Sequence, residues 1–198
     1  MNTPFLKKYQ PRHFKDFEKD KEITDILNML MNMNLLNILL IGSHGCGKTS
    51  LLDAIIREYY GSDRINKDNI LYINNLKEQG IQYYRTEVKI FCQIPSTVVG
   101  KKKFIVLDDI DTINDQSQQV FRNCMDKYYN NVFFILSCTN THKIIDSLQS
   151  RCTILEMKAI DKPFLTKILT NIIKNENVSI TDGSKEFILH TCNNSIRL

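Results

Sequence analysis

Residues 42–49, with the sequence Gly-Ser-His-Gly-Cys-Gly-Lys-Thr, restrict the possible folds of this chain more than any other segment. An apolar run over residues 38–41 leads directly into them, and a pattern typical of an amphipathic helix follows over residues 48–60. This order of strand, glycine-rich loop and helix is typical of proteins that bind the phosphates of a nucleoside triphosphate. Glycines let backbone N–H groups approach an anion, which a Cβ would obstruct. The alternative interpretation is a glycine-rich turn that arises by chance.

Two side chains at the end of this loop have the chemistry that a polyphosphate requires. Lys48 would bring a cation to the β and γ phosphates, and the Thr49 hydroxyl would be a ligand for Mg2+. The helix that follows directs its positive N-terminal end at the same charge. The residues expected to contact the nucleotide from this segment are Gly42, Ser43, His44, Gly45, Cys46, Gly47, Lys48, Thr49 and Ser50.

A second chemical signal is an apolar run that ends in two acidic residues, Asp108 and Asp109. A carboxylate at the carboxyl end of a strand beside a phosphate loop can hold Mg2+, and its neighbour can orient or deprotonate an attacking water. We therefore expect Asp108 to hold the metal and Asp109 to act as the base, although a solvated strand end would have the same sequence. The three lysines at 101–103 precede this run, and we expect them to form a solvated turn.

Short apolar runs alternate with helical patterns along most of the chain, which predicts an α/β fold of the P-loop type, with a five-stranded parallel sheet between two layers of helices. After residue 157 only helical patterns follow, over 162–175 and 183–192. We therefore expect an ATP-binding domain at 1–158 and a small helical domain at 159–198. The expected strands are 38–41, 70–74, 104–108, 132–138 and 153–157, and helices are also expected at 22–33 and 48–60.

Composition narrows the class of protein. The chain has 198 residues and a net charge of +4, which permits nucleic-acid binding without demonstrating it. Residues 1–14 have no apolar signal-peptide core, and asparagines interrupt the apolar run at 29–41, so we expect a soluble intracellular protein without a membrane segment. The six cysteines show neither a Cys-x-x-Cys pair nor a zinc-site spacing, and reduced thiols are therefore expected.

Further segments carry sequence patterns that occur together in one protein family. They are residues 5–11, residues 74–81 with the helix expected at 83–91, residues 117–126, residues 138–152 and residues 194–197. In their order and near-family spacing they resemble the small subunits of replication factor C type clamp loaders, a branch of the AAA+ ATPases. The Ser-Arg-Cys triplet at 150–152 is the most telling match, because it contains the trans-acting arginine of that family. The resemblance extends over essentially the whole chain.

This resemblance implies functional roles for residues outside the phosphate loop. Thr139 would lie near the γ phosphate and the attacking water, and Asn140 is the adjacent alternative. Arg197, in the helical lid, would bind phosphate oxygens with its planar donors. Leu6 would border the adenine of the bound ATP.

Three more cationic residues are expected to act on other molecules. The resemblance implies that Arg151 contacts the ATP of a neighbouring subunit, as an arginine finger that neutralises charge in the transition state. Arg85 and Lys89 lie four residues apart on one expected helix, where they would meet the phosphates of duplex DNA. Both could equally be solvated surface residues.

The chain departs from the family pattern at three places. Asp109 stands where the family has a glutamate, so the expected base is one methylene shorter, and a displacement near 1 Å can cost on the order of a hundredfold in rate. Slow hydrolysis is therefore expected. Gln10 replaces an arginine, and the chain ends at Leu198, so we expect an incomplete lid and no collar domain.

The resemblance implies an ATPase subunit of a DNA sliding-clamp loader. Its cofactors would be ATP and Mg2+, and its partners would be other clamp-loader subunits in a ring or spiral, a sliding clamp and primer-template DNA, without a membrane. Its location would be the nucleus in a eukaryote, or the cytoplasm or viral factory for an archaeal or viral protein. Two alternatives remain: an ATP-binding interaction subunit with weak or no hydrolysis, and a different AAA+ DNA remodeller.

Overall fold

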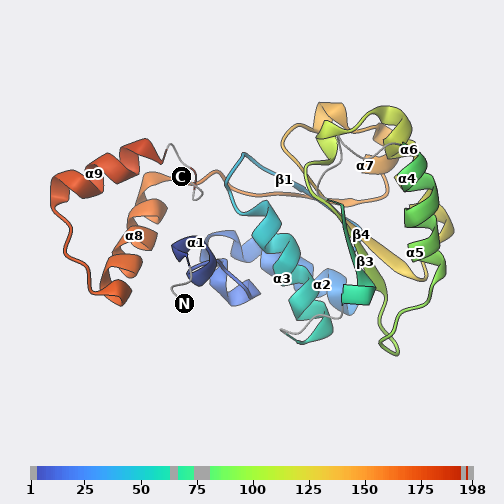
Figure 1. Ribbon diagram of the computed structural model, residues 1–198, viewed down its shortest axis with the longest axis horizontal. Helices are drawn as coiled ribbons and strands as arrows, with labels where there is room; N and C mark the ends of the chain where they lie inside the picture. The colour runs from blue at the N-terminus through green and yellow to red at the C-terminus, as the bar shows by residue number, and fades with distance from the viewer. Residues whose placement is uncertain (1–3, 63–66, 74–80, 193–194, 196–198) are drawn as a thin grey trace.

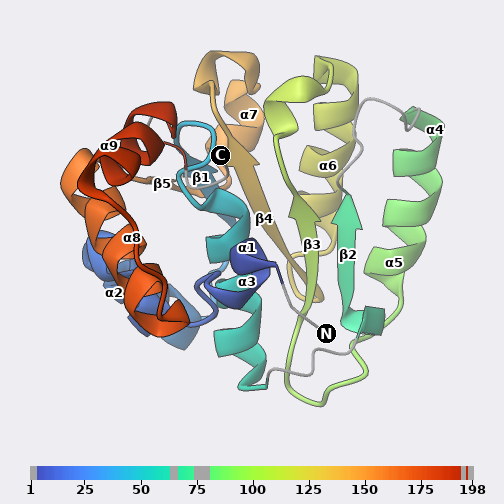
Figure 2. The same ribbon diagram turned by 60° about the vertical axis from the view of Figure 1, so that its left-hand side comes forward.

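The computed structural model describes residues 4–62, 67–73, 81–192 and 195 of the chain. Its centre is a parallel five-stranded sheet in the order β2-β3-β4-β1-β5 (Figure 2). The strands expected from the sequence are confirmed, with ends that differ by at most one residue where the structure describes them. They are β1 (Ile38–Ile41), β2 (Ile70–Ile73), β3 (Lys103–Leu107), β4 (Val132–Cys138) and β5 (Thr153–Glu156).

The side chains of the sheet alternate between two apolar clusters, one on each face. Ile38 and Leu40 belong to the cluster on the side of α2 and α3, and Leu39 belongs to the cluster on the side of α6. This alternation is the two-residue period of a strand, and Figure 1 shows the sheet between these two groups of helices. Because both faces are covered, β4 is buried along its whole length and its sequence is an apolar run.

Helix α3 (Lys48–Tyr60) follows the glycine-rich loop as the sequence predicts. It buries the apolar side chains on one face, and it ends at Gly61, whose φ of 63° is left-handed. The Gly61 N–H donates to the Arg57 carbonyl oxygen at 2.8 Å. Glycine stabilises this helix end because it adopts a left-handed φ without the strain that a Cβ would cause. The buried apolar residues of α3 are Leu51, Leu52, Ala54, Ile55, Ile56 and Tyr59.

The helical segment expected at 83–91 is longer and less regular than the sequence suggests. It runs as α4 (Ile81–Tyr83), a π-helical stretch (Tyr84–Val88) and α5 (Lys89–Gln93). Tyr84, Val88 and Cys92 are all buried against α6 and the sheet. The remaining helices beside the sheet are α2 (Lys21–Asn32), α6 (Asp115–Lys127) and α7 (Asp146–Gln149), and α1 (Phe5–Lys8) lies in the N-terminal segment.

The expectation of a solvated lysine turn at 101–103 is wrong for Lys103, which is buried, whereas Lys101 is exposed. Lys101 Nζ donates to Tyr59 O near the end of α3, and Lys102 Nζ donates to Tyr129 O just beyond α6. Lys103 is 2% exposed, and its Nζ donates to the carbonyl oxygens of Phe91 (2.8 Å) and Ile94 (3.1 Å) at the end of α5. The last carbonyls of a helix have no partner within the helix and carry partial negative charge. The three lysines therefore place one ammonium group near the end of each of three helices, α3, α6 and α5.

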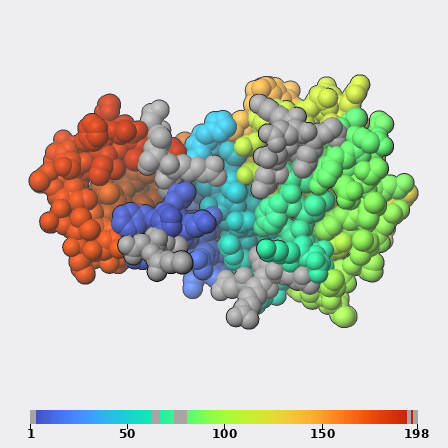
Figure 3. All heavy atoms as spheres, in the orientation of Figure 1, coloured from blue at the N-terminus to red at the C-terminus, as the bar shows by residue number. Residues whose placement is uncertain are grey.

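Two helices, α8 (Lys162–Glu176) and α9 (Asp182–Thr191), follow β5 and lie to one side of the sheet (Figure 1). The N-terminal segment packs between these helices and α3, as the space-filling view shows (Figure 3). Lys8 Nζ and Tyr9 Oη both donate to Glu176 Oε1, at 2.6 and 2.7 Å. The division into two domains at residue 158 stays a prediction. Among the residues described, no helix has the length and apolar character needed to cross a bilayer.

Candidate nucleotide-binding site

The glycine-rich loop connects β1 to α3 at the carboxyl edge of the sheet. Gly45 and Gly47 have φ values of 75° and 106°, a backbone conformation that side chains with a Cβ rarely adopt. A Cβ on Gly45 would also collide with Ser195, which follows α9 in the chain. The loop therefore has the backbone geometry that its sequence predicts, and a C-terminal residue lies against it.

Lys48 is buried within this loop, with 6% of its surface exposed. Its Nζ donates to the carbonyl oxygens of Gly42 (2.9 Å) and Ser43 (3.1 Å). An ammonium group has three donors, so one remains beyond these two bonds. The loop thus keeps a cation beside its own backbone, where the phosphates of a nucleotide would lie.

Asp108 joins three elements at the carboxyl edge of the sheet. Its Oδ2 accepts a hydrogen bond from Thr49 Oγ1 (2.7 Å) at the start of α3, and its Oδ1 accepts one from Ser137 Oγ (2.5 Å) in β4. Thr49 and Asp108 were predicted to share a metal, and the structure brings the two side chains together. Ser137 was not predicted from the sequence; it is fully buried inside an otherwise apolar strand. A polar residue in an otherwise apolar strand was the sequence feature that could have identified it.

Asp109 directly follows Asp108 and has a left-handed backbone conformation, with φ of 56°. Its N–H donates to Ser137 Oγ at 3.0 Å. Burial, followed by the negative charge of Asp108, raises the pKa of the Asp109 carboxyl, while Lys48 opposes that shift. A carboxylate with a raised pKa is suited to accept a proton, which is the role predicted for it.

Thr139 and Asn140 follow β4, and both are anchored by an acidic residue that sequence analysis did not single out. Asp111 Oδ2 accepts hydrogen bonds from Thr139 Oγ1 (2.6 Å), Thr139 N (3.1 Å) and Asn140 N (3.1 Å). Burial alone would raise the pKa of Asp111, but these hydrogen bonds hold it below its ordinary value. The signal was available in the sequence as a third acidic residue just beyond Asp108 and Asp109.

A cavity of about 400 Å³ lies beside Asp109, Asp111 and Thr139, at the carboxyl ends of the strands. The residues present fit a magnesium-bound triphosphate, because a loop cation, a hydroxyl and two carboxylates converge on one edge of the sheet. The Thr49 hydroxyl and the Asp108 carboxylate are hard oxygen ligands of the kind that Mg2+ prefers. The cavity is lined by His44, Asp109, Asp111, Thr112, Thr139 and Lys143.

Other predicted nucleotide contacts are less closely defined by the structure. Leu6 lies on α1 and is 56% exposed. Gln10, which replaces the family arginine, donates through Nε2 to Ser50 Oγ at 3.1 Å, so the N-terminal segment contacts the start of α3. Cys46 is buried beneath the loop, and Asn140 is exposed. Arg197 lies outside the described residues.

Arg151 lies near the amino ends of the strands, whereas Lys48 lies beyond the carboxyl end of β1. Residue 153, two positions later, pairs with Ile38 at the start of β1, whereas the phosphate loop follows the end of that strand. A strand of this length separates its ends by roughly 10 Å. The Arg151 guanidinium makes two parallel bonds to Asp126, Nε to Oδ1 at 2.5 Å and Nη2 to Oδ2 at 3.1 Å. The guanidinium is therefore paired within its own chain, away from its own phosphate loop.

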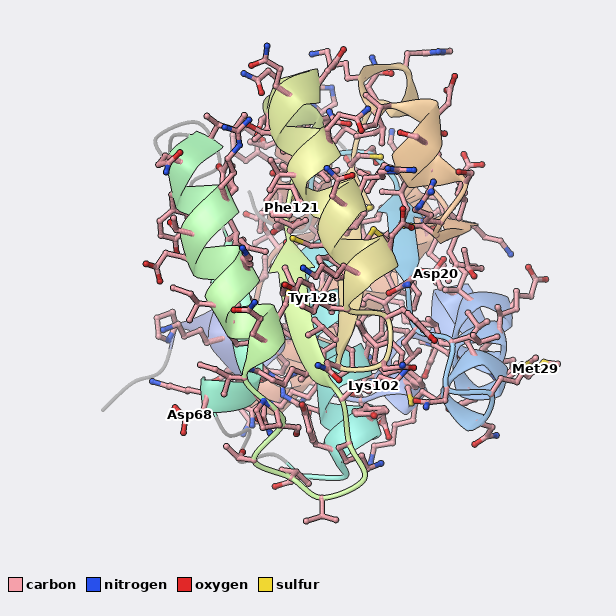
Figure 4. The ribbon with its side chains drawn as sticks, turned by 90° about the vertical axis from the view of Figure 1, so that its right-hand side faces the viewer. Asp20, Met29, Asp68, Lys102, Phe121 and Tyr128 are labelled. Atoms are coloured by element: carbon pink, nitrogen blue, oxygen red, sulfur yellow. The ribbon has the colours of Figure 1, made fainter. Side chains whose placement is uncertain are left out.

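Arg85 and Lys89 lie side by side on the outer face of the molecule. Together with Lys127 they line a groove of about 290 Å³ between the α4–α5 segment and α6. Figure 4 looks onto these helices, with Phe121 and Tyr128 marking the course of α6. The structure thus brings the two predicted residues together and adds a third cation that sequence analysis missed. Lys127 was not found because it belongs to a different helix.

Comparison with known proteins shows similarity to replication factor C subunits. The chain is 34% identical over 195 residues to the replication factor C small subunit of Picrophilus torridus, covering 98% of this chain and 60% of that protein. It is 32% identical over 202 residues to replication factor C subunit 4 of Saccharomyces cerevisiae, covering 100% of this chain and 61% of that protein. The chain thus spans about three fifths of the length of these relatives.

Solved structures share the fold. A RuvB mutant from Thermotoga maritima superposes with a TM-score of 0.72 at 16% identity, covering 95% of this chain and 62% of that chain. A DNA polymerase III gamma subunit-related protein from the same organism superposes with a TM-score of 0.62 at 17% identity, covering 86% and 55%. The family model described as "ATPase family associated with various cellular activities" matches residues 38–159, from β1 to just beyond β5. On that match, which takes in the phosphate loop, both aspartates and Arg151, the chain belongs to the AAA family of ATPases.

Proposed function

We propose that this chain is an ATPase subunit of a DNA sliding-clamp loader of the replication factor C type. The observation that carries the proposal is the position of Arg151, which lies at the opposite edge of the sheet from Lys48. A subunit with this arrangement supplies an arginine to a neighbour and needs one from another neighbour. The similarity to replication factor C subunits over nearly the whole chain supports the same assignment.

ATP is the proposed substrate, and Mg2+ is the proposed cofactor. Thr49 and Asp108 would hold the ion, which neutralises charge on the β and γ phosphates when it is bound. Lys48 binds the phosphates from within the loop. Asp109 accepts the proton of the attacking water, a role that its raised pKa favours. The shorter side chain of Asp109 leads us to propose slow turnover.

Arg151 completes the site of the adjacent subunit. Its pairing with Asp126 is partly exposed, with 28% and 44% of the two side chains accessible. An exposed ion pair of this kind contributes little, about 0–1 kcal/mol, so a neighbouring phosphate can compete for the guanidinium. We therefore propose that hydrolysis requires an interface between subunits, in a ring or spiral of several chains.

DNA is the proposed partner of the groove between α5 and α6. Arg85, Lys89 and Lys127 present three ammonium or guanidinium groups along one surface, and the polar residues Gln116, Gln119 and Asn123 lie among them. Cations and amides of this kind bind phosphate oxygens without reading the base sequence. We propose that the groove contacts the backbone of primer-template DNA.

Steady-state hydrolysis of ATP by the assembled complex tests this function. Turnover is expected to rise when a sliding clamp and primed DNA are both added, and to fall when Arg151→Ala replaces the wild-type subunit. Arg12→Ala, which removes an exposed arginine on the N-terminal segment, is the matched control. A turnover rate that does not change when the clamp and DNA are added, or that is unchanged in Arg151→Ala, would contradict the proposal.

A second candidate function is an ATP-binding interaction subunit that does not hydrolyse ATP. The specific observation in its favour is Asp109, which stands where the family has a glutamate. Such a subunit would bind ATP tightly without turnover, and Asp109→Glu would restore turnover. Hydrolysis by the wild-type subunit in the assembled complex would exclude this function.

A further inference from the structure

Three hydrogen bonds converge on a single oxygen of Asp111. The donors are the Thr139 hydroxyl at 2.6 Å, the Thr139 N–H at 3.1 Å and the Asn140 N–H at 3.1 Å, and all of them reach Oδ2. Asp111 lies in the short 3-10 helix Ile110–Thr112 after β3, whereas Thr139 and Asn140 follow the neighbouring strand β4. One carboxylate oxygen thus fixes both the backbone and the side chain of the residue predicted to lie near the γ phosphate.

The direction of the hydroxyl bond determines what Thr139 can do in the cavity. An ionised carboxylate only accepts hydrogen bonds, and the bonds from residues 139 and 140 hold the pKa of Asp111 below its ordinary value although burial opposes that shift. The single hydrogen of the Thr139 hydroxyl is therefore committed to Asp111. What remains on Thr139 Oγ1 are acceptor lone pairs.

A group that can only accept does not bind a phosphate oxygen, which is also an acceptor. It can accept from a water molecule, which has two hydrogens to donate. Asp109 and Thr139 line the same cavity, and Asp109 is the second acceptor there. A water that donates one hydrogen to each of them keeps a lone pair free for attack on phosphorus.

We propose that Asp111 is a positioning residue for ATP hydrolysis. It turns the Thr139 hydroxyl so that Thr139 receives a hydrogen bond from the attacking water and makes none to the γ phosphate. This inference rests on the proposed ATPase function, and it assigns Thr139 to the water rather than to the nucleotide. In this role Asp111 acts through Thr139, to which its Oδ2 is hydrogen-bonded.

Hydrolysis and binding measured separately on the assembled complex test this role. Asp111→Asn replaces the acceptor with an amide that can donate to Thr139 Oγ1, which reverses the polarity of that bond. We expect kcat to fall by roughly ten- to a hundredfold, the range for a misplaced reacting group. The dissociation constant for ATP should change by less than about threefold, because the phosphate contacts are made elsewhere. Asp25→Asn, the same change on the exposed face of α2, is the control.

A double-variant cycle separates this role from a merely structural one. Thr139→Val removes the hydroxyl and leaves both N–H bonds to Asp111 in place, and Thr139→Ser restores the hydroxyl. If Asp111 acts through Thr139, the kcat of the Asp111→Asn, Thr139→Val double variant should match that of Thr139→Val alone. A general loss of structure would instead lower Tm and weaken binding of ADP as well as ATP.

The outcomes distinguish this inference from the function on which it rests. If the wild type hydrolyses ATP and Asp111→Asn or Thr139→Val has the same kcat, the role of Asp111 is overturned and the ATPase function stands. If Asp111→Asn does not fold, Thr139→Val still decides, because the inference requires its kcat to fall and Thr139→Ser to recover it. A wild-type complex that binds ATP without hydrolysing it would overturn the ATPase function and this role together.

Discussion

The Thr49 hydroxyl donates a hydrogen bond of 2.7 Å to Asp108 Oδ2, which joins the first turn of α3 to the end of β3. The second Asp108 oxygen accepts from Ser137 in β4, so one carboxylate connects three elements of the fold. The Thr49 hydroxyl and the Asp108 carboxylate are both oxygen ligands of the kind that Mg2+ prefers. This arrangement holds the two proposed Mg2+ ligands together before any ion binds, so less conformational freedom is lost on binding.

Removal of the Thr49 hydroxyl is expected to weaken magnesium-dependent ATP binding. Thr49→Val keeps the shape of the side chain but removes one proposed oxygen ligand of Mg2+ and one of the donors that orient Asp108. Loss of a group that orients a metal ligand typically costs about 10–100-fold in metal affinity, so we expect a loss of roughly tenfold or more in affinity for ATP with Mg2+. Titrations with Mg2+ and with a chelator check this, and Thr49→Ser should bind as the wild type does.

Asp109→Asn is expected to stabilise the fold while it abolishes hydrolysis. Burial and the charge of Asp108 disfavour the ionised form of Asp109, which raises its pKa in the folded chain. An amide at this position carries no charge and avoids that cost. A gain of about 1 kcal/mol would raise Tm by roughly 2–4 °C in a chain of this length. An unchanged or lower Tm for the variant at neutral pH would show that the ionised Asp109 carboxylate does not destabilise the fold.

The pH dependence of this effect has a definite sign. Because the folded-state pKa of Asp109 is raised, its contribution to stability is greatest below the unfolded-state value of about 3.9 and is lost as pH rises through the folded-state pKa. The amide that Asp109→Asn introduces does not titrate. The Tm difference between variant and wild type should therefore be small at acidic pH, grow as pH rises and then level off, and thermal melts across this range measure it.

The sequence predicts the sheet well because its central strands β1, β3 and β4 are buried on both faces. Runs such as Val132–Cys138 read as continuous apolar segments, and the phosphate loop marks where β1 ends and α3 begins. Contacts between distant segments were not predictable in the same way. Asp111 reaches Thr139 only because β3 and β4 are neighbours in the sheet. Lys127 joins Arg85 and Lys89 only because α6 packs beside α5.

The lysine run shows how local context misleads when the tertiary partner is unknown. Three consecutive charges suggest solvent exposure, yet burial lowers the pKa of Lys103, whose ammonium bonds two carbonyl oxygens at the end of α5. Lys103→Met would leave those carbonyls without this donor, and a buried unsatisfied group costs about 1–3 kcal/mol.

We therefore expect Lys103→Met to lower the free energy of unfolding by about 1–3 kcal/mol, measured by urea denaturation. Lys101→Met is the matched control, because Lys101 is exposed and its bond to Tyr59 O can be replaced by water. We expect this control to lie within about 0.5 kcal/mol of the wild type. Equal effects of the two substitutions would contradict the role assigned to burial.

Arg151→Ala is expected to separate binding from hydrolysis. The isolated chain should bind ATP as the wild type does, because Arg151 lies at the other edge of the sheet from Lys48. In the assembled complex, hydrolysis should fall by about 10³-fold or more, the effect typical of an arginine finger. Parallel binding and turnover assays with Arg12→Ala as control measure this, and a loss of ATP affinity in the isolated chain would place Arg151 in its own site instead.

Calorimetric titration of the chain with ATP and Mg2+ tests the central claim most directly, because every proposed step depends on a nucleotide bound at Lys48. We expect saturable binding by the wild type, a loss of at least about tenfold in affinity for Lys48→Met, and unchanged binding for Lys21→Met on the exposed side of α2. A wild-type chain that does not bind ATP with Mg2+, or a Lys48→Met variant that binds as tightly as the wild type, would contradict the account.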